Sequence, residues 1–362
     1  MKIGILTFHN CSNYGAAFQT YALHTAIVKN ISHSCEVINY SNDYISSDVE
    51  ISKMKVIRSI KDFIRYCILY KAYKKKNDVF KKFINDSVVL SENEYKKDNI
   101  KESNSIYDVF ITGSDQVFNL LLTHNDTSYF LDFVHQEKKR ISYAASVGNT
   151  ELIDMNADIY VENLSKFNNI SVREEQTKNK LMLYGNFNIS VVMDPTFLLS
   201  KDEWESIGND IVVSEKYILL YLISPEKYNF EFARKLSKIT GYTIYYINYK
   251  PFKEKGMKNL WAVTPEQFIT LLKKAEYVVT NSFHGTALSI NMNKNFFYEL
   301  SQKKSNGNSR IEQLIGFFGL ESRQIVAGNN DYINENINYD KINYILDDLK
   351  NESLNFLSKA LS

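Results

Sequence analysis

Five polar segments of this sequence carry side chains that could bind or transform a small anion. In Asn281-Ser282-Phe283-His284-Gly285, an apolar run gives way to a helical pattern. The N–H groups and the positive dipole end at a helix N-terminus favour phosphate or carboxylate. His284 could bind such an anion or donate a proton near neutral pH, and capping or packing is the structural alternative. Ser282 could cap the helix, and Gly285 could let the backbone approach a ligand closely.

Two further segments place a charged side chain at the end of an apolar run. Arg173 precedes a helical pattern and could hold a carboxylate or phosphate through two parallel hydrogen bonds. An ion pair with Glu174, Glu175 or another carboxylate is its structural alternative. Asp115, in Gly113-Ser114-Asp115-Gln116, could accept a proton from a hydroxyl or hydrogen-bond a sugar, and a turn in which it caps the next helix is the alternative.

The last two segments could contribute substrate contacts from loops. Asn13-Tyr14-Gly15 opens the first helical pattern, where contact with a substrate and tight packing of the turn are both open. It lacks the GxGxxG pattern of dinucleotide sites. Lys303, Lys304 and Arg310 lie in a polar stretch around Gly307, so their charges could close over an anion, although a solvated surface loop is the alternative.

Several other chemistries lack their sequence signatures. The six histidines are scattered without HxH or HExxH spacing, so no metal site is expected. No P-loop and no GxSxG motif is present, and no cofactor is expected. Cys11, Cys35 and Cys67 form no CxxC pair, and their odd number argues against a disulfide framework.

The elements that must position these residues follow an α/β pattern. Short apolar runs lead into polar, glycine-containing turns and then into helical patterns, as is typical of βα units in parallel sheets. We place a boundary in the polar stretch 199–215, with domains at 1–205 and 206–362, and expect the helix Tyr339–Ala360 to pack back on the first domain. Strands are expected at Lys2–Phe8, Cys35–Tyr40, Asp108–Thr112, Arg140–Ser146, Asn169–Val172, Ser190–Met193, Tyr217–Ile223, Thr243–Tyr249, Tyr277–Thr280 and Asn295–Glu299. Helices are expected at Pro265–Lys274, with Thr264 as its N-cap, and at Thr286–Met292.

Composition limits the partners of the chain. Its 362 residues carry a formal net charge of +1, which gives no general attraction to nucleic acid. The first residues resemble a strand rather than a signal peptide, and no apolar run is long enough to span a bilayer. We therefore expect a cytoplasmic protein. The basic stretch 53–82 is the one candidate for peripheral contact with the inner face of the membrane.

Taken together, six segments resemble the polysaccharide pyruvyl transferase family. Their order and spacing carry the resemblance more than any single motif does. The matching segments are Ile3–Leu23, Phe110–Phe118, Tyr143–Ser146, Ser171–Glu174, Met193–Thr196 and Thr280–Ile290.

The resemblance implies a GT-B-like α/β fold, in which two Rossmann-type domains with parallel sheets face a central cleft. It implies phosphoenolpyruvate as donor and a sugar, free or lipid-linked, as acceptor. The family arginine and histidine that bind or act on phosphoenolpyruvate correspond to Arg173, on the acceptor-side domain, and His284, on the donor-side domain. A further basic residue would be Lys303, Lys304 or Arg310. The family often has Arg-Leu before the histidine, where this chain has Ser282-Phe283.

The implied reaction adds the pyruvyl group to sugar hydroxyls of a bacterial surface polysaccharide, such as a capsule or exopolysaccharide, and releases phosphate. Protonation of the methylene carbon of phosphoenolpyruvate creates positive character at C2, which one hydroxyl attacks before a second displaces phosphate. His284 would bind phosphate and act as general acid, and Asp115 would act as base or acceptor contact. A glycosyltransferase with a nucleotide-sugar donor and a non-catalytic glycan- or anion-binding protein remain alternatives.

Overall fold

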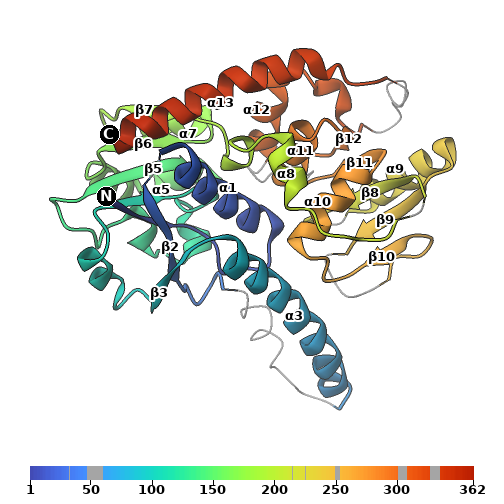
Figure 1. Cartoon of the computed structure of the whole chain (residues 1–362), viewed down its shortest axis with the longest axis horizontal. Helices are drawn as coiled ribbons and strands as arrows, with labels where there is room; N and C mark the ends of the chain where they lie inside the picture. Colours follow the sequence, from blue (N-terminus) through green and yellow to red (C-terminus); the bar gives the residue numbers. More distant parts are fainter. Residues whose placement is uncertain are drawn as a thin grey trace. The chain divides into compact units, whose positions relative to one another are not determined.

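The computed structural model describes residues 1–31, 33–46, 60–213, 215–224, 226–248, 253–300, 308–326 and 335–362 (Figure 1). Its contacts divide the chain into two compact units. The first comprises Met1–Lys55, Phe80–Leu198 and Asp347–Ser362, and the second comprises Val56–Val79 and Leu199–Leu346. The boundary expected at residues 205 and 206 falls within helix α8 (Lys201–Ser206), which belongs to the second unit.

The first unit is built on a seven-stranded sheet with the order β3-β2-β1-β4-β5-β6-β7. All pairs of neighbouring strands in it are parallel. The strands are β1 (Lys2–Leu6), β2 (Ser34–Tyr40), β3 (Leu90–Tyr95), β4 (Val109–Thr112), β5 (Lys139–Ala145), β6 (Asn169–Val172) and β7 (Ile189–Val191).

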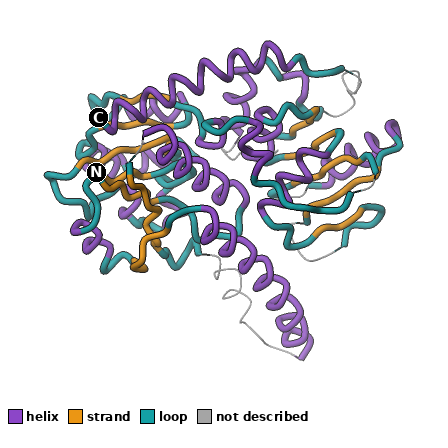
Figure 2. Tube along the Cα trace, in the orientation of Figure 1, coloured by secondary structure: helices purple, strands orange, loops and turns teal. Residues whose placement is uncertain are grey.

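Helices lie between these strands in the chain, as the βα pattern predicts (Figure 2). Central strands such as β4, with the sequence VFIT, are buried along their whole length because a parallel sheet is covered on both faces. The helices of this unit are α1 (Tyr14–Ile31), α4 (Leu120–Thr123), α5 (Glu151–Met155), α6 (Ala157–Leu164) and α7 (Glu175–Leu181), with 3₁₀ turns η1 (Ile100–Ser105), η2 (Thr127–Phe130) and η3 (Pro195–Phe197).

The second unit holds a five-stranded parallel sheet with the order β10-β9-β8-β11-β12. Its strands are β8 (Tyr217–Tyr221), β9 (Thr243–Ile247), β10 (Lys258–Leu260), β11 (Tyr277–Thr280) and β12 (Asn295–Tyr298). Its helices, besides α8, are α9 (Lys227–Thr240), α10 (Pro265–Lys274), α11 (Phe283–Asn291) and α12 (Asn308–Phe318), with the 3₁₀ turn η4 (Glu321–Arg323).

Two long helices contribute residues to both units. The division between the two units falls within helix α3 (Ile60–Ser87) and again within helix α13 (Tyr339–Leu361). The end of α13 packs within the first unit, where the Ser353 hydroxyl accepts a hydrogen bond from the Met193 N–H at 3.0 Å. The Phe356 ring lies 6.4 Å from that of Tyr143 in the same unit.

Most expected elements are present, with some differences at their ends. Thr264 caps α10 through a capping box, as predicted. The helix after β11 was expected from Thr286 but begins at Phe283, because Ser282 already accepts a hydrogen bond from Gly285 N–H. The sequence analysis did not predict β3, whose pattern LSENEY is mostly polar, nor β10 and α12.

Strand order fixes where polar loops can meet a ligand. In each sheet, successive strands are first added toward one edge and then toward the other. The change of direction lies between β1 and β4 in the first sheet and between β8 and β11 in the second. Ligands of doubly wound sheets bind beyond the carboxyl ends of the strands at such points. Ser114 and Asp115 follow β4, and His284 follows β11, so both segments lie at these places.

Candidate active site

The loop after β4 is held in a strained shape by the end of β5. Asp115 has a φ of 72°, in the left-handed region that non-glycine residues rarely adopt. Its carbonyl accepts a hydrogen bond from Ser146 N–H at 2.9 Å, and its side chain accepts one from Gln116 N–H at 2.9 Å. Ala144, in β5, also has a positive φ of 49°. Such strain persists where surrounding contacts impose it, and it is common at functional sites.

Arg173 forms a buried ion-pair cluster with two carboxylates. Its Nε donates to Glu174 Oε1 at 3.1 Å and its Nη1 to Asp194 Oδ2 at 2.7 Å. The side chains of Arg173 and Glu174 are each 4% exposed, and that of Asp194 is 0% exposed. The ion pair with Glu174, one of the alternatives left open by the sequence, is therefore present.

Asp194 joins this cluster to the loop after β4. Its Oδ2 also accepts from the Ser114 hydroxyl at 3.0 Å, and its Oδ1 accepts from Thr196 N–H at 3.0 Å and from the Thr196 hydroxyl at 2.7 Å. The sequence analysis gave Asp194 no role. The local sequence Asp-Pro-Thr indicates only that Asp194 caps the turn η3. Its pairing with Arg173 depends on the fact that β6 and β7, which precede the two residues, are neighbours in the sheet.

The charge of Arg173 is secured by this arrangement. Burial alone would lower its pKa, but attraction from Glu174, Asp194 and Asp115 outweighs burial and raises the pKa above its usual value. The guanidinium therefore stays protonated at every working pH. Since Nε and Nη1 already bind carboxylates, the cluster fixes the position of Arg173 beside Asp115.

The first turn of α1 uses its polar residues structurally. Asn13 Oδ1 accepts hydrogen bonds from Gly15 N–H at 2.8 Å and from Ala16 N–H at 3.3 Å. The Tyr14 ring is buried, with its centroid 4.8 Å from that of Phe80. Capping and packing thus account for both residues, and the exposed Asn13 is the one of the two with a surface that a ligand could reach.

His284 occupies the first turn of α11, at the carboxyl end of β11. Ser282 caps this helix, with its hydroxyl 3.2 Å from Gly285 N–H. The His284 side chain is buried, and its ring meets the edge of Phe283 at a centroid distance of 5.1 Å. A first-turn histidine beside helix N–H donors can bind phosphate and transfer a proton within the same small volume.

Gly285 is required by packing against the sheet. A methyl group there would lie 2.5 Å from Thr280 Oγ1 and 3.0 Å from Tyr221 Cδ1. We expect Gly285→Ala to lower the free energy of unfolding by about 1–3 kcal/mol, because α11 must move away from β8 and β11. Urea unfolding measures this.

The matched control for that variant is Gly316→Ala in α12, where an added methyl group meets nothing within 4 Å. It should be neutral or stabilising by up to about 1 kcal/mol, since alanine favours the helix. Equal losses in the two variants would contradict the packing explanation.

A buried carboxyl group that the sequence analysis did not single out lies next to this helix. Glu299 follows β12, and its N–H donates to Thr280 O at 3.0 Å. Its side chain accepts a hydrogen bond from Asn229, whose Oδ1 lies 3.5 Å from Asn281 Nδ2. Asn281 Oδ1 in turn accepts from Ile223 N–H at 2.9 Å. These polar groups connect the carboxyl ends of β8, β11 and β12.

Glu299 should make stability depend on pH. Burial, assisted by the charge of Glu226, raises its pKa from 4.5 to about 7. The folded protein therefore holds this proton more tightly than the unfolded chain. The resulting stabilisation is complete below pH 4.5 and is lost as the pH rises to 7. Over this range the wild type should lose free energy of unfolding on the order of 1–2 kcal/mol, allowing for partial screening by water. Glu299→Gln should not show this loss, because glutamine does not titrate.

Melting curves of the wild type and Glu299→Gln at pH 5.5 and 8.5 test this. Relative to the wild type, the glutamine variant should have a higher melting temperature at pH 8.5 than it has at pH 5.5. A difference that is the same at both pH values would show that Glu299 titrates normally.

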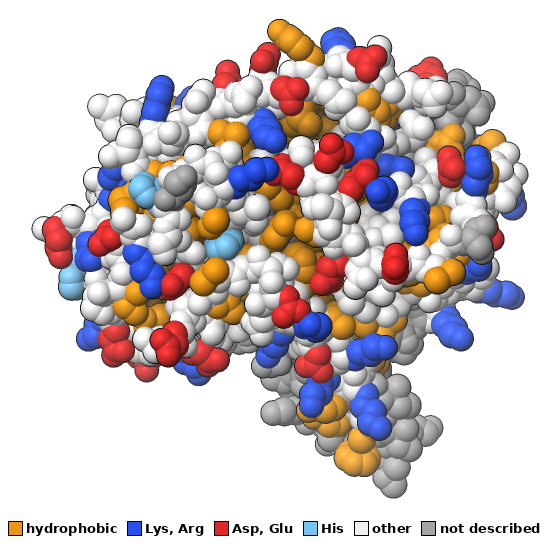
Figure 3. Space-filling view, in the orientation of Figure 1, with side chains coloured by type: hydrophobic (Ala, Val, Ile, Leu, Met, Phe, Trp, Pro, Cys, Tyr) orange, Lys and Arg blue, Asp and Glu red, His pale blue; other side chains and the backbone are white. Residues whose placement is uncertain are grey.

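The basic residues expected beyond His284 are only partly described. Lys303 and Lys304 lie outside the described residues. Arg310 is half-buried in the first turn of α12, within the second unit. Over the face shown in Figure 3, basic and acidic side chains are interspersed, as the formal net charge of +1 suggests. Attraction of an anion must therefore come from local groups such as the α11 N-terminus.

Within the described part of the chain there is neither a cluster of metal-binding side chains nor a helix that could span a membrane. The described residues contain no group of three or more His, Cys, Asp or Glu side chains suited to a metal ion. None of the described helices combines the length and apolar character needed to cross a bilayer.

Solved structures share this architecture at low sequence identity. A candidate UDP-N-acetylglucosamine 2-epimerase from Listeria monocytogenes aligns with a TM-score of 0.53 at 12% identity, covering 99% of this chain and 90% of that chain. UDP-GlcNAc 2-epimerase from Methanocaldococcus jannaschii, in complex with UDP-GlcNAc and UDP, gives 0.50 at 13%, covering 96% and 93%. The Neisseria meningitidis enzyme, bound to UDP-GlcNAc, gives 0.50 at 11%, covering 100% and 99%.

The two parallel sheets and these likenesses define a GT-B-like α/β protein. A search among curated proteins found no match to the sequence. The family model of polysaccharide pyruvyl transferase matches residues 13–298. The chain therefore belongs to the polysaccharide pyruvyl transferase family, and it is a transferase of polysaccharide biosynthesis by that membership.

Proposed function

We propose that this protein transfers the pyruvyl group of phosphoenolpyruvate to hydroxyls of a sugar in a surface polysaccharide or its precursor. The products would be a pyruvate ketal and phosphate. The match of the family model over residues 13–298, which includes His284 in the first turn of α11, carries this proposal. The compound has a phosphate and a carboxylate, and helix N–H donors, a histidine and an arginine are suited to both groups.

The proposed reaction begins at the methylene carbon. The imidazole of His284 and the N–H groups at the α11 N-terminus bind the phosphate. His284 also supplies the proton that converts the methylene to a methyl group. The C2 carbon then carries positive character, and one acceptor hydroxyl adds there and loses its proton. A second hydroxyl displaces phosphate and gives its proton to the departing phosphate, which closes the ketal ring, and the proton lost by the first hydroxyl returns through solvent to His284. No external oxidant, reductant or metal is needed for this balance.

Asp115 is the proposed acceptor for a hydroxyl proton. Its carboxylate is half-buried at the carboxyl end of β4 and lies within the electrostatic reach of Arg173. Because Arg173 pairs with Glu174 and Asp194, the proposed role of Arg173 is to hold this corner of the first unit together and to offset its negative charge, instead of the donor contact that the family resemblance implied. One of the three basic residues Lys303, Lys304 and Arg310 is assigned to the donor, and the first unit to the acceptor.

Incubation with phosphoenolpyruvate labelled with ¹³C in its pyruvyl carbons tests the reaction. We would supply a panel of neutral oligosaccharides, free and lipid-linked, and follow phosphate release and the labelled carbon. The proposal expects label in the glycan in equal amount to released phosphate. Sugar transfer from a nucleotide sugar under the same conditions would instead identify a glycosyltransferase. Glycan binding without either reaction would identify a non-catalytic binding protein.

A further inference from the structure

A pocket of about 350 Å³ lies on the first unit, away from the Arg173 cluster. It is formed by residues 40–44 at the end of β2, by residues 96–98 after β3, and by Thr123, His124 and Asp126 at the end of α4 and just beyond it. These segments lie at the carboxyl edge of the seven-stranded sheet, the edge that also carries Asp115. The pocket is thus on the ligand-binding side of the fold, although no residue in it was singled out from the sequence.

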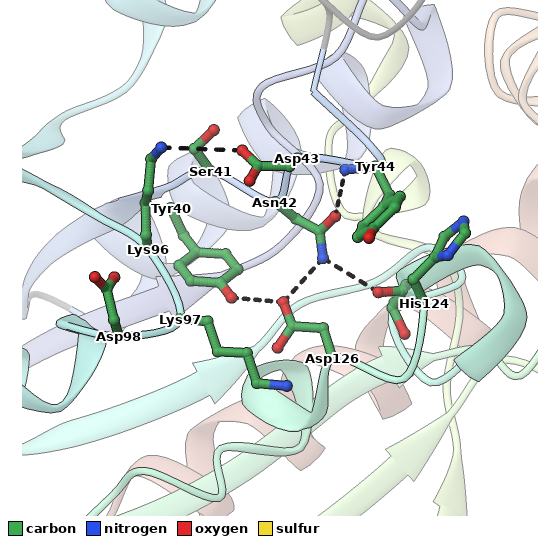
Figure 4. Close-up of a pocket in the computed structure, with 11 residues that line it drawn as sticks. Tyr40, Ser41, Asn42, Asp43, Tyr44, Lys96, Lys97, Asp98, His124 and Asp126 are labelled. Carbon is green, nitrogen blue, oxygen red and sulfur yellow. Dashed lines mark hydrogen bonds and ion pairs between the residues drawn. The ribbon is translucent and has the colours of Figure 1, made fainter.

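The floor of the pocket is a network of buried, hydrogen-bonded side chains (Figure 4). Asp126 Oδ2 accepts from the Tyr40 hydroxyl at 2.5 Å and from Asn42 Nδ2 at 2.9 Å. Asn42 Nδ2 also donates to Thr123 O at 3.2 Å, and Asn42 Oδ1 accepts from Tyr44 N–H at 2.8 Å. Burial raises the pKa of Tyr40, helped by Asp126, so its hydroxyl stays neutral and remains a donor.

One side of the pocket presents a flat aromatic surface. The Tyr44 ring stacks on the His124 ring with their centroids 3.8 Å apart and an interplanar angle of 13°. His124 reaches this place through a left-handed backbone conformation, with a φ of 53°. Tyr44 is nevertheless 58% exposed, so most of an ordered aromatic side chain remains open to water. Ordered, exposed aromatic rings are common recognition elements because they offer apolar area at low entropic cost.

The other side carries charges of both signs. In Figure 4, Lys96, Lys97 and Asp98 lie across from the Tyr44–His124 pair, with the Tyr40–Asp126–Asn42 network between them. Lys96 pairs with Asp43 at 3.9 Å, so neither sign dominates the rim. A pocket that served an anion would carry excess positive charge. Donors and acceptors beside an aromatic surface suit a neutral polyhydroxyl compound, whose C–H face stacks and whose hydroxyls both donate and accept.

We propose that this pocket binds a neutral sugar residue of the acceptor glycan, at a distance from the sugar that receives the pyruvyl group. This inference rests on the proposed function for the identity of the glycan. The ends of β2 and β4 are separated by two strand spacings, roughly 10 Å. A glycan of two or more residues can therefore reach from Tyr44 to Asp115. The pocket would select acceptors by length and by the sugar that precedes the reacting one.

Binding of neutral oligosaccharides tests this without any donor. We would titrate gluco-, galacto- and manno-oligosaccharides and their N-acetylated forms into the wild type, Tyr44→Ala and Lys97→Gln. At least one oligosaccharide should bind the wild type, and both variants should weaken it, on the order of tenfold for the tyrosine. Tyr344→Ala, at a tyrosine that is 71% exposed in the second unit, is the matched control and should bind as the wild type does.

Three results would overturn the proposal. They are no oligosaccharide binding by the wild type, equal binding by Tyr44→Ala, or tight binding of inorganic pyrophosphate that Lys97→Gln abolishes. The last would show an anion site. Phosphoenolpyruvate binding, measured in the same proteins, separates the two proposals. Loss of glycan binding in Tyr44→Ala supports the sugar site even if the wild type fails to bind phosphoenolpyruvate, and only the proposed function then fails.

Discussion

Replacement of His284 by alanine should lower turnover by about 10²–10⁴-fold, the usual contribution of a general acid. The proposed reaction needs a proton at the methylene carbon and a ligand for the phosphate, and His284 is assigned both roles. Its place in the first turn of α11 puts the imidazole beside the N–H donors of that helix. Phosphate release with a working acceptor measures the loss.

The comparison needs proof that the variant is folded. Near-ultraviolet circular dichroism and a melting curve would supply it, and His135→Ala is the control at an exposed histidine in the first unit. That control should keep full activity. A folded His284→Ala protein that turns over at the wild-type rate would remove His284 from the mechanism.

Replacement of Arg173 by alanine should be the most destabilising single change considered. It leaves Glu174 and Asp194 buried without their cation, and removal of one partner from a buried ion pair costs about 3–5 kcal/mol. By contrast, Lys166→Ala removes an exposed pair with Glu162 and should cost less than about 1 kcal/mol. Urea unfolding of both variants measures the difference.

A double variant identifies the cause. Arg173→Met combined with Asp194→Asn removes both charges of one pair, so it should lose less stability than the sum of the two single changes. Additive losses would mean that Arg173 stabilises the fold by packing alone. Arg173→Lys keeps a positive charge but cannot reproduce both contacts of the guanidinium with Glu174 and Asp194, so it should recover only part of the stability that alanine loses.

The sequence predicted the elements best where packing and local signals agree. Segments such as Tyr277–Thr280 and Pro265–Lys274 were located with the same bounds that the structure has, because an apolar run or a capping residue marks each end. Strand β3 was missed because its polar pattern is set by its place at the edge of the sheet. The start of α11 was placed too late because Phe283, His284 and Gly285 read as loop residues, although Ser282 had been recognised as a possible cap.

Side-chain partnerships were harder to predict than elements. Arg173 and Asp194 were both within recognised motifs, but their contact depends on the register of β6 against β7. Glu299 and Asn229 are far apart in sequence and meet only through the order of β8, β11 and β12. The pocket proposed to bind a sugar combines three such segments. No local pattern encodes which loops share one edge of a sheet.

Thermal unfolding in the presence of phosphoenolpyruvate tests the central claim most directly. A ligand held only by the folded protein stabilises it by about 2.7 kcal/mol at a hundredfold excess over its dissociation constant. The account predicts a rise in melting temperature for the wild type with phosphoenolpyruvate, none for folded His284→Ala, and none with a nucleoside diphosphate. A rise with the nucleoside diphosphate alone, or a phosphoenolpyruvate effect that is unchanged in His284→Ala, would contradict it.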